Sequence, residues 1–501
     1  AVQKDWMMDK GYPGPKYLRL TKDQWANDPQ GFYENAKDQV GFPLVVKSAN
    51  QGSSIGVNIV KEANFSIFRE AVNNSLFETE IRAEEWEQMD KVQFIRDLSD
   101  IRSSLGFPII MDNQLIFHPE AALEFLNKGF ETKSMIRLQA VRGEVEVVVE
   151  SMISGKEFSC IVVQDESGKV IALPPTEIAK STAFFDYKSK YLPGLSRKIT
   201  PIELPDVEIE KIRQSCSQLF TDFGFNVYAR IDGFYTNEGE IFLNDPNTTS
   251  GMMPSSFFFH QAAEIGLNPS QFLTYLIRTS IAERIHTIPS MVMKSEMLER
   301  LDKQLVKNAS QKNTKQNVAI IMGGYSTERH ISVESGRNIF EKLSSSGKYQ
   351  PIPVFLTGKD DDHHLYVLPI NVMLKDNADD IKAKVEAYHH APIITKIINE
   401  AKAITEKYTE TPPVFEPKKI SYTDLTSICE TVFIALHGRP GEDGQVQKHL
   451  DALHLPYNGS DVASSSTTID KFKTNNILRE NGFLVADGAL VQKSSWESDK
   501  D

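Results

Sequence analysis

Short apolar runs that end at glycine or polar turns recur along the chain, and this pattern predicts an α/β protein. Leu44-Val45-Val46 has the character of a buried strand, and the stretch after it holds too much glycine and serine to continue as a helix. Residues 318–324 repeat the pattern, with an apolar strand that turns at Gly323-Gly324 before a predicted helix. A strand, a glycine turn and a helix in this order are typical of the start of a doubly wound α/β domain.

Changes in polarity divide the chain into predicted domains. Residues 301–316 are polar and poor in apolar periodicity, which predicts a linker between a first domain at 1–300 and a second at 317–465. Residues 78–140 are more charged than their flanks and predict an inserted subdomain. Its first part, 78–104, has the pattern of an exposed amphipathic helix.

A faint internal repeat relates the two ends of the chain. Residues 5–25 can be laid without gaps on residues 476–496, so that Gly11 coincides with Gly482. We therefore interpret residues 466–501 as the start of a further domain that is built like the beginning of the first.

Charge and cysteine content narrow the class of partner. The chain has 55 Lys and Arg against 68 Asp and Glu, a net charge of −13, which argues against nucleic acid or an anionic membrane as a general partner. Its 3 cysteines are scattered and indicate neither a disulfide framework nor a zinc site. No apolar stretch reaches membrane-spanning length and no signal-peptide pattern is present, so we expect a cytoplasmic protein. The first residue is Ala1, which is compatible with a fragment.

Lys47 and the glycines after it form the first candidate site. A strand lysine followed by a flexible segment from Gly52 to Gly56 suggests phosphate binding. The familiar phosphate loop places its lysine after the glycines, at the start of a helix, whereas here the lysine comes first. The order here is therefore a strand lysine first and then a flexible flap.

A polar hairpin forms the second candidate site. Residues 228–256 predict two strands around a turn at 237–239. Arg230 and Asp232 are two apart on the first strand, and Asp245 and Asn247 are two apart on the second, so each pair shares a face. Together they offer the hard oxygen ligands that suit Mg²⁺, beside an arginine for a phosphate or an oxyanion. A solvated hairpin is the alternative, which the lysine and flap upstream disfavour.

Three further segments carry candidate chemistry, each with a plainer structural explanation. Residues 184–198 mix aromatic and basic side chains and suggest either a lid over phosphates or an anchored surface loop. Glu150 and Glu157 flank strands, where they could meet a nucleotide or simply be exposed. His437 ends a predicted strand, where ligands bind in α/β domains, although a lone histidine is more often structural.

Ordered motifs then relate the chain to a known family. "GGYSTERHISVESG" stands at 323–336, "ALHGRPGEDGQVQ" at 435–447, and "VVKSANQGSSIG" at 45–56, with Ser48 in place of the usual proline. Further counterparts lie at 184–191, 229–234, 245–251, 457–460 and 470–471. On these residues the chain resembles the D-alanine–D-alanine ligase family of the ATP-grasp superfamily. The resemblance implies α+β ATP-grasp lobes and a Rossmann-like substrate domain with a parallel sheet.

The resemblance also implies a role for each candidate residue. Those implied to bind ATP are Lys47, Gly52, Ser54, Gly56, Glu150, Glu157, Lys190 and Lys471. The implied metal ligands are Asp232, Asp245 and Asn247, and the implied catalytic residues are Arg230, Gly251, Glu328, Ser53 and Tyr191. Substrate binding is implied for Ser256, His437 and Glu328.

The implied reaction joins two D-alanines through an acyl phosphate, for peptidoglycan precursor synthesis. It would use ATP and two Mg²⁺, with Mn²⁺ as a possible substitute. Two alternatives stay open: a ligase with another acceptor, such as D-lactate or a different amino acid, and a nucleotide-binding module of weakened activity. Asp245 favours the second alternative, because it stands where the family usually has Glu and reaches about one methylene less far.

The order of the motifs is the reverse of the family order. The portion from Glu328 to Lys471 precedes the portion from Lys47 to Ser256 in a family member but follows it here. We interpret the chain as the middle of a tandem double ligase, truncated at both ends. The alternative is that the later lobe docks onto the earlier ATP site and completes it. Self-association of tandem copies, or a homodimer, is compatible with either interpretation.

Overall fold

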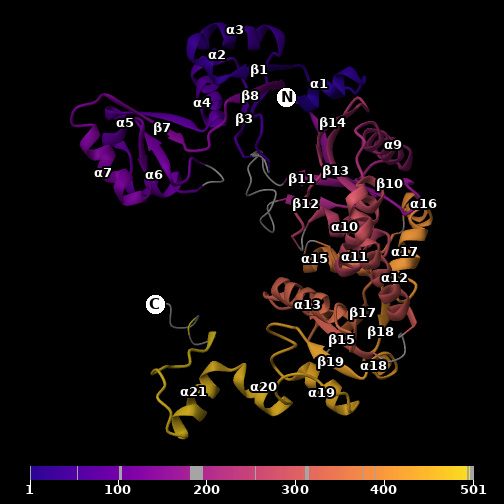
Figure 1. Ribbon diagram of the computed structural model, residues 1–501. Helices are drawn as coiled ribbons and strands as arrows, with labels where there is room; N and C mark the ends of the chain where they lie inside the picture. Colours follow the sequence, from indigo (N-terminus) through magenta and orange to yellow (C-terminus); the bar gives the residue numbers. More distant parts are fainter. Residues whose placement is uncertain are drawn as a thin grey trace. The chain divides into compact units, whose positions relative to one another are not determined.

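The computed structural model describes residues 2–52, 55–100, 104–180, 196–253, 256–310, 315–360, 362–375, 377–389, 391–493 and 496. Helices and strands are both present along its whole length, which confirms the α/β expectation (Figure 1). Two compact units are present. Unit 1 comprises Ala1–Ser159, Glu177–Ile199 and Ile231–Pro246, and unit 2 comprises Cys160–Thr176, Thr200–Arg230 and Asn247–Asp501.

An antiparallel four-stranded sheet opens unit 1. Its order is β1 (Tyr17–Thr21), β8 (Glu146–Ser151), β2 (Leu44–Ser48) and β3 (Val57–Val60). Leu44 and Val46 of β2 are buried in a core with α3 (Pro29–Gln39) and α4 (Phe65–Leu76), which confirms the predicted strand. Because side chains alternate along a strand, Lys47 lies on the opposite face.

Residues 78–140 have a sheet and a core of their own. The sheet order is β4 (Glu78–Arg82), β7 (Met135–Ala140), β5 (Ile109–Met111) and β6 (Gln114–Ile116), with helices α5 (Ala83–Gln88), α6 (Lys91–Leu98) and α7 (Pro119–Gly129). The prediction of one helix from 78 is wrong. Ile81 is buried in a strand paired with β7, and Asp90 caps a new helix through the backbone N–H groups of Val92 and Gln93.

A further sheet carries the predicted polar hairpin. Its order is β12 (Ser196–Ile199), β11 (Thr176–Lys180), β9 (Gly155–Gln164), β13 (Tyr228–Thr236) and β14 (Ile241–Asn247), and β10 (Val170–Ala172) pairs with β9. Strands β13 and β14 turn at the predicted place, where Gly239 has φ +84°. The hairpin prediction is confirmed.

A five-stranded sheet lies within residues 316–434 of unit 2. Its order is β18 (Lys418–Ile420), β17 (Asp362–Val367), β16 (Tyr349–Lys359), β15 (Gln316–Gly323) and β19 (Thr431–Ile434), and β15 runs parallel to β16 and β19. Helix α13 (Arg329–Ser344) follows β15 through Gly323, whose φ is +94°. A Cβ at Gly336 would stand 2.6 Å from Cβ of Met322, so glycine lets α13 approach β15. The predicted strand, glycine turn and helix are confirmed.

The expected linker at 301–316 is helical as far as Ser310. Helix α12 (Ser295–Ser310) turns Leu298, Leu301 and Leu305 to one half-buried side, and Asp302 pairs with Arg278 of helix α11 (Pro269–Thr287) at 3.0 Å. The helical periodicity is hard to detect within 301–316, because two of the apolar residues of this helix, Met297 and Leu298, precede that segment.

The two repeated segments have similar local structure. Helix α1 (Val2–Asp9) and helix α21 (Lys471–Glu480) end at positions that coincide in the repeat, and Gly11 and Gly482 both have φ +81°. The strand β1 has no counterpart at 488–492 among the described residues, because a strand needs a partner and β1 has β8.

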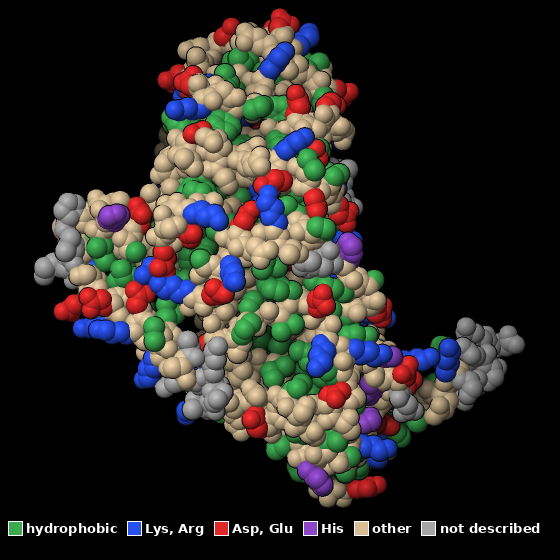
Figure 2. Space-filling model, turned by 90° about the vertical axis from the view of Figure 1, so that its right-hand side faces the viewer, with side chains coloured by type: hydrophobic (Ala, Val, Ile, Leu, Met, Phe, Trp, Pro, Cys, Tyr) green, Lys and Arg blue, Asp and Glu red, His purple; other side chains and the backbone are tan. Residues whose placement is uncertain are grey.

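Charged side chains of both signs are interspersed on the face drawn in Figure 2. Among the described helices, none has the length and apolar character to cross a bilayer.

Candidate functional site

Two lysines and a glutamate converge in unit 1. Val45 of β2 pairs with Glu150 of β8, so Lys47, two residues along, shares a face with that glutamate. Lys47 Nζ lies 2.6 Å from Glu150 Oε1, and Lys4 Nζ of α1 lies 2.7 Å from Oε2. The side chains of Glu150 and Lys4 are only 8% and 11% exposed. We call Lys4, Lys47 and Glu150 the lysine cluster.

The electrostatics of the lysine cluster are governed by burial and by mutual attraction. Burial alone would raise the pKa of Glu150, but the ammonium groups of Lys47 and Lys4 outweigh it and hold that pKa below its ordinary value. Burial lowers the pKa of Lys4, and the neighbouring Lys47 lowers it further, against the attraction of Glu150. With two cations and one anion, the cluster is suited to an anionic ligand.

Lys4 connects the lysine cluster to the predicted metal-binding strand. Its ammonium donates to Oδ1 of Asn244 on β14 at 3.0 Å, and Asp245 is the next residue. Sequence reasoning missed Lys4, because a lysine on a short helix is usually solvated. The repeat gave no signal for it, because Lys4 precedes the repeated segment, which begins at residue 5.

The proposed metal ligands provide oxygen donors from β13 and β14. Asp232 is half-buried, Asp245 is exposed and Asn247 is half-buried. Among the described residues, no three His, Cys, Asp or Glu side chains gather as a metal site. Two carboxylates and an amide oxygen nonetheless fit Mg²⁺, which keeps waters and takes phosphate oxygens in addition to few protein ligands.

Arg230 and Gly251 are held close together in unit 2. Arg230 Nη1 donates to Oγ of Ser250 at 3.1 Å, and Gly251 follows Ser250 directly. A Cβ at Gly251 would meet no atom within 4 Å among those described, so its backbone borders open space. Ser256 caps helix α10 (Phe257–Glu264) at its positive end, and within the described structure its buried hydroxyl has no hydrogen-bond partner.

Glu328 and His437 are also brought together, at the start of α13. His437 N–H donates to Ser332 Oγ at 2.8 Å, and its Nε2 lies 3.0 Å from Ser335 Oγ. A Cβ at Gly438 would lie 3.4 Å from Oε2 of Glu328, the residue that precedes α13. Both residues predicted for the first substrate therefore lie at one end of this helix.

The remaining predicted residues have varied positions. Ser53, Ser54, Lys190 and Tyr191, with most of the predicted lid at 184–198, lie outside the described residues. Gly52 is exposed, and Gly56 has φ +69° and approaches Ser48. Glu157 is buried at the start of β9, whereas Lys471 is exposed on α21.

Comparisons with known proteins agree with the motifs. A family model described as D-ala D-ala ligase C-terminus matches residues 6–111 and 127–278, and one described as D-ala D-ala ligase N-terminus matches residues 317–460. The reversed order along the chain is thereby confirmed. The first match omits residues 112–126, inside the segment with its own core.

Individual relatives are distant. A D-alanine–D-alanine ligase of Bacillus cytotoxicus is 24% identical over 281 residues, 56% of this chain and 59% of that protein. D-alanine–D-alanine ligase B of Clostridium perfringens is 26% identical over 205 residues, 41% of this chain and 65% of that protein. The chain thus spans less than two thirds of these relatives. Among solved structures, the D-alanine-D-alanine ligase from Coxiella burnetii covers 59% of this chain and 60% of its own, at 18% identity and a TM-score of 0.36.

Proposed function

The chain belongs to the D-alanine–D-alanine ligase family, and on that premise we propose that it binds Mg-ATP and ligates D-alanine to D-alanine. The observation that carries this proposal is the lysine cluster, in which the buried Lys4 and the half-buried Lys47 meet beside the strand of Asp245. Such a concentration of positive charge is what a triphosphate requires. The dipeptide would serve peptidoglycan precursor synthesis, in the cytoplasm where ATP is available.

ATP would lie across the sheet of Lys47. In this proposal Lys47 and Lys471 contact phosphates, the backbone from Gly52 to Gly56 covers them, and Glu157 with Glu150 meets the base and ribose. Asp232, Asp245 and Asn247 would hold Mg²⁺. When bound, Mg²⁺ would offset the repulsion between a triphosphate and an approaching carboxylate.

The chain's own residues would then position two amino acids. Glu328, with Ser53, Tyr191 and His437, would hold the first D-alanine, whose carboxylate attacks the γ-phosphate to give an acyl phosphate and ADP. The free hydroxyl of Ser256 and the positive end of α10 suit the carboxylate of the second D-alanine. Its amine attacks the acyl carbon, and phosphate leaves.

Arg230 and the backbone N–H of Gly251 would stabilise the oxyanion that forms in this second step. Preorganised donors at a developing charge are worth about 10²–10³ in rate. The contact between Arg230 and Ser250 supports this role, because it holds the guanidinium beside Gly251. Lys190 would close over the acyl phosphate and keep water out.

The test is phosphate release from Mg-ATP with D-alanine, L-alanine or D-lactate as substrate. We expect release that depends on D-alanine and that Arg230→Ala abolishes. The exposed Arg142→Ala is the matched control and should behave as the wild type. Release that depends on D-lactate together with D-alanine would instead indicate the alternative acceptor.

A nucleotide-binding module of weakened activity is the second candidate, favoured by Asp245. Measuring ATP affinity separately from turnover distinguishes this module from the ligase. Such a module would bind ATP but would not release phosphate. Asp245→Glu would then raise release from a low wild-type level.

A further inference from the structure

Within unit 2, buried and charged contacts join residues from the match to the ligase C-terminus (6–111 and 127–278) to residues from the match to the ligase N-terminus (317–460). At their centre is Glu264, at the end of α10. Its carboxylate accepts from Lys375 Nζ at 3.0 Å and from Asn371 Nδ2 at 3.1 Å. The side chains of Glu264 and Lys375 are only 5% and 13% exposed. A buried charge is costly when it has no opposite charge beside it. Glu264 and Lys375 therefore need each other in the folded protein.

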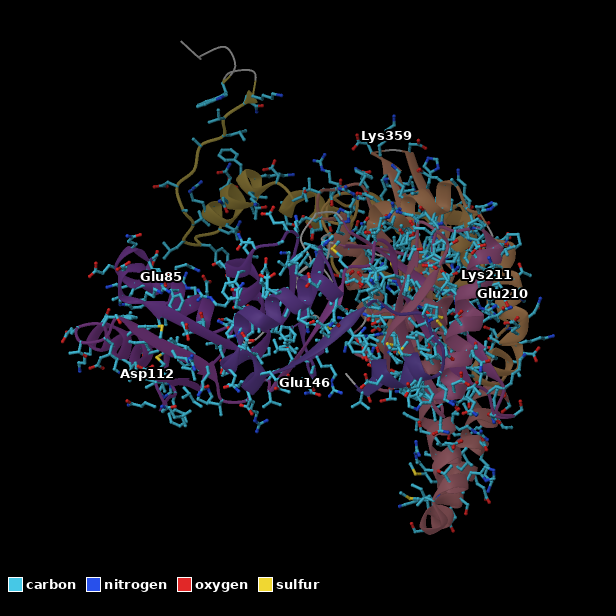
Figure 3. The ribbon with its side chains drawn as sticks, turned by 90° about the horizontal axis from the view of Figure 1, so that it is seen from above. Glu85, Asp112, Glu146, Glu210, Lys211 and Lys359 are labelled. Carbon is cyan, nitrogen blue, oxygen red and sulfur yellow. The ribbon has the colours of Figure 1, made fainter. Side chains whose placement is uncertain are left out.

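A second set of contacts joins helix α9 (Asp206–Asp222) to helix α16 (Pro392–Glu400). The guanidinium of Arg213 is 4% exposed and pairs with Glu400. Glu210, which is labelled in Figure 3, lies 2.9 Å from Lys396 Nζ. Asp206 accepts from the backbone N–H of Ile393 at 3.1 Å.

A third set joins α11, and the residue that follows α10, to helix α17 (Lys402–Tyr408). The rings of Tyr275 and Tyr408 meet edge to face with centroids 5.5 Å apart. Thr405 Oγ1 donates to the carbonyl of Ile265 at 2.9 Å. Ile265 and Tyr275 are fully buried, so separation of the two segments would expose apolar as well as charged groups. We call these three sets of contacts the docking interface.

The docking interface connects the helices that carry proposed substrate residues. Helix α10 follows its cap Ser256 and ends at Glu264, which pairs with Lys375. The carbonyl of Lys375 accepts from Arg337 of α13, and Arg337 Nε donates to the carbonyl of Met373 at 2.8 Å. Helix α13 begins after Glu328. One chain of direct contacts thus runs from the Ser256 helix to the Glu328 helix.

We propose that residues 317–460 are the working partner of the ATP-grasp segment that precedes them, so that the ligase is assembled in the reverse of the family's chain order. Glu328 and His437 would then serve the same reaction as Arg230 and Ser256. The inference rests on the proposed function for its catalytic part. The docking interface supports this inference. If residues 317–460 were only tethered to the ATP-grasp segment, buried ion pairs between the two would have no purpose.

Charge exchange across the docking interface tests the inference. The full chain would be made with Glu264→Lys, with Lys375→Glu and with both changes. The matched control is the exchange of Lys402 and Glu406, an exposed pair within one helix. Thermal unfolding, ATP affinity and D-alanine-dependent phosphate release are measured for each. If a reversed charge prevents folding, Lys375→Met replaces Lys375→Glu as the variant that removes the ion pair.

We expect each single reversal to lower Tm by about 5 °C or more, since it leaves like charges buried together. Release should fall at least about tenfold, because a displacement of about 1 Å can cost a hundredfold. ATP affinity should change far less, and the double exchange should recover both Tm and release. Single variants that match the control in Tm and release would overturn the inference.

The outcomes separate this inference from the proposed function. D-alanine-dependent release that survives both Glu328→Ala and the interface variants would leave the ligase function standing and overturn the inference. Absence of release from the wild-type chain would overturn the ligase function. Rescue of Tm by the double exchange would in that case still support the docked arrangement.

Discussion

Lys4→Met tests whether the lysine cluster is built as a unit. The substitution keeps the length of the side chain and removes its charge. In the wild type, Lys4 Nζ contacts Glu150 at 2.7 Å and Asn244 at 3.0 Å. Removing one partner of a buried ion pair costs about 3–5 kcal/mol when the remaining charge is left alone.

The expected loss is smaller than that, because Glu150 keeps Lys47 at 2.6 Å. Burial also disfavours the charged form of Lys4, as the lowered pKa of that lysine indicates, so part of the pair's attraction is already offset. We therefore expect the free energy of unfolding to fall by about 1–3 kcal/mol, the cost of buried polar groups that lose a partner.

The assay is urea unfolding at pH 7, with Lys16→Met as the control at an exposed lysine. The control should change stability by no more than about 0.5 kcal/mol. A double-mutant cycle of Lys4→Met with Glu150→Gln should show a coupling energy of about 0.5–3 kcal/mol. If Lys4→Met were as stable as the control, or if the coupling energy were zero, Lys4 and Glu150 would not stabilise the fold together, and the prediction would be wrong.

Three further outcomes are expected. The folded pKa of Glu150 lies below its ordinary 4.5, so the stabilisation that Glu150 provides is present above pH 4.5 and is lost as pH falls through the folded pKa. The stability difference between wild type and Glu150→Gln, measured by urea unfolding, should therefore shrink as pH falls below 4.5. Arg213→Met, which strips Glu400 of a buried cation, should cost about 3 kcal/mol and lower Tm in calorimetry, and an unchanged Tm would contradict the contact between α9 and α16. Trp86→Ala should cost about 3–5 kcal/mol locally, because Trp86 fills the core of residues 78–140; hydrogen exchange should then lose protection in β7 and keep it in β15.

Local patterns along the chain determine much of the fold by themselves. Alternating burial around Leu44 and Val46 matches the predicted strand, and Gly239 and Gly323 mark turns that only glycine adopts easily. These signals are carried by neighbouring residues, whose spacing matches the period of a strand or the dihedral angles of a turn. The ordered motifs likewise placed Arg230 with Gly251, and Glu328 with His437, within their segments.

Tertiary structure alone decided which distant residues meet. Lys4 reaches Glu150 only because α1 packs beside β8, and Glu264 finds Lys375 across 111 positions of chain. The segment from 78 became a strand and two helices because β7, more than fifty residues later, supplies a partner for Ile81. A charged side chain has no period that reveals its partner. Its burial and pairing are set by the packing of whole elements, which no short window of sequence contains.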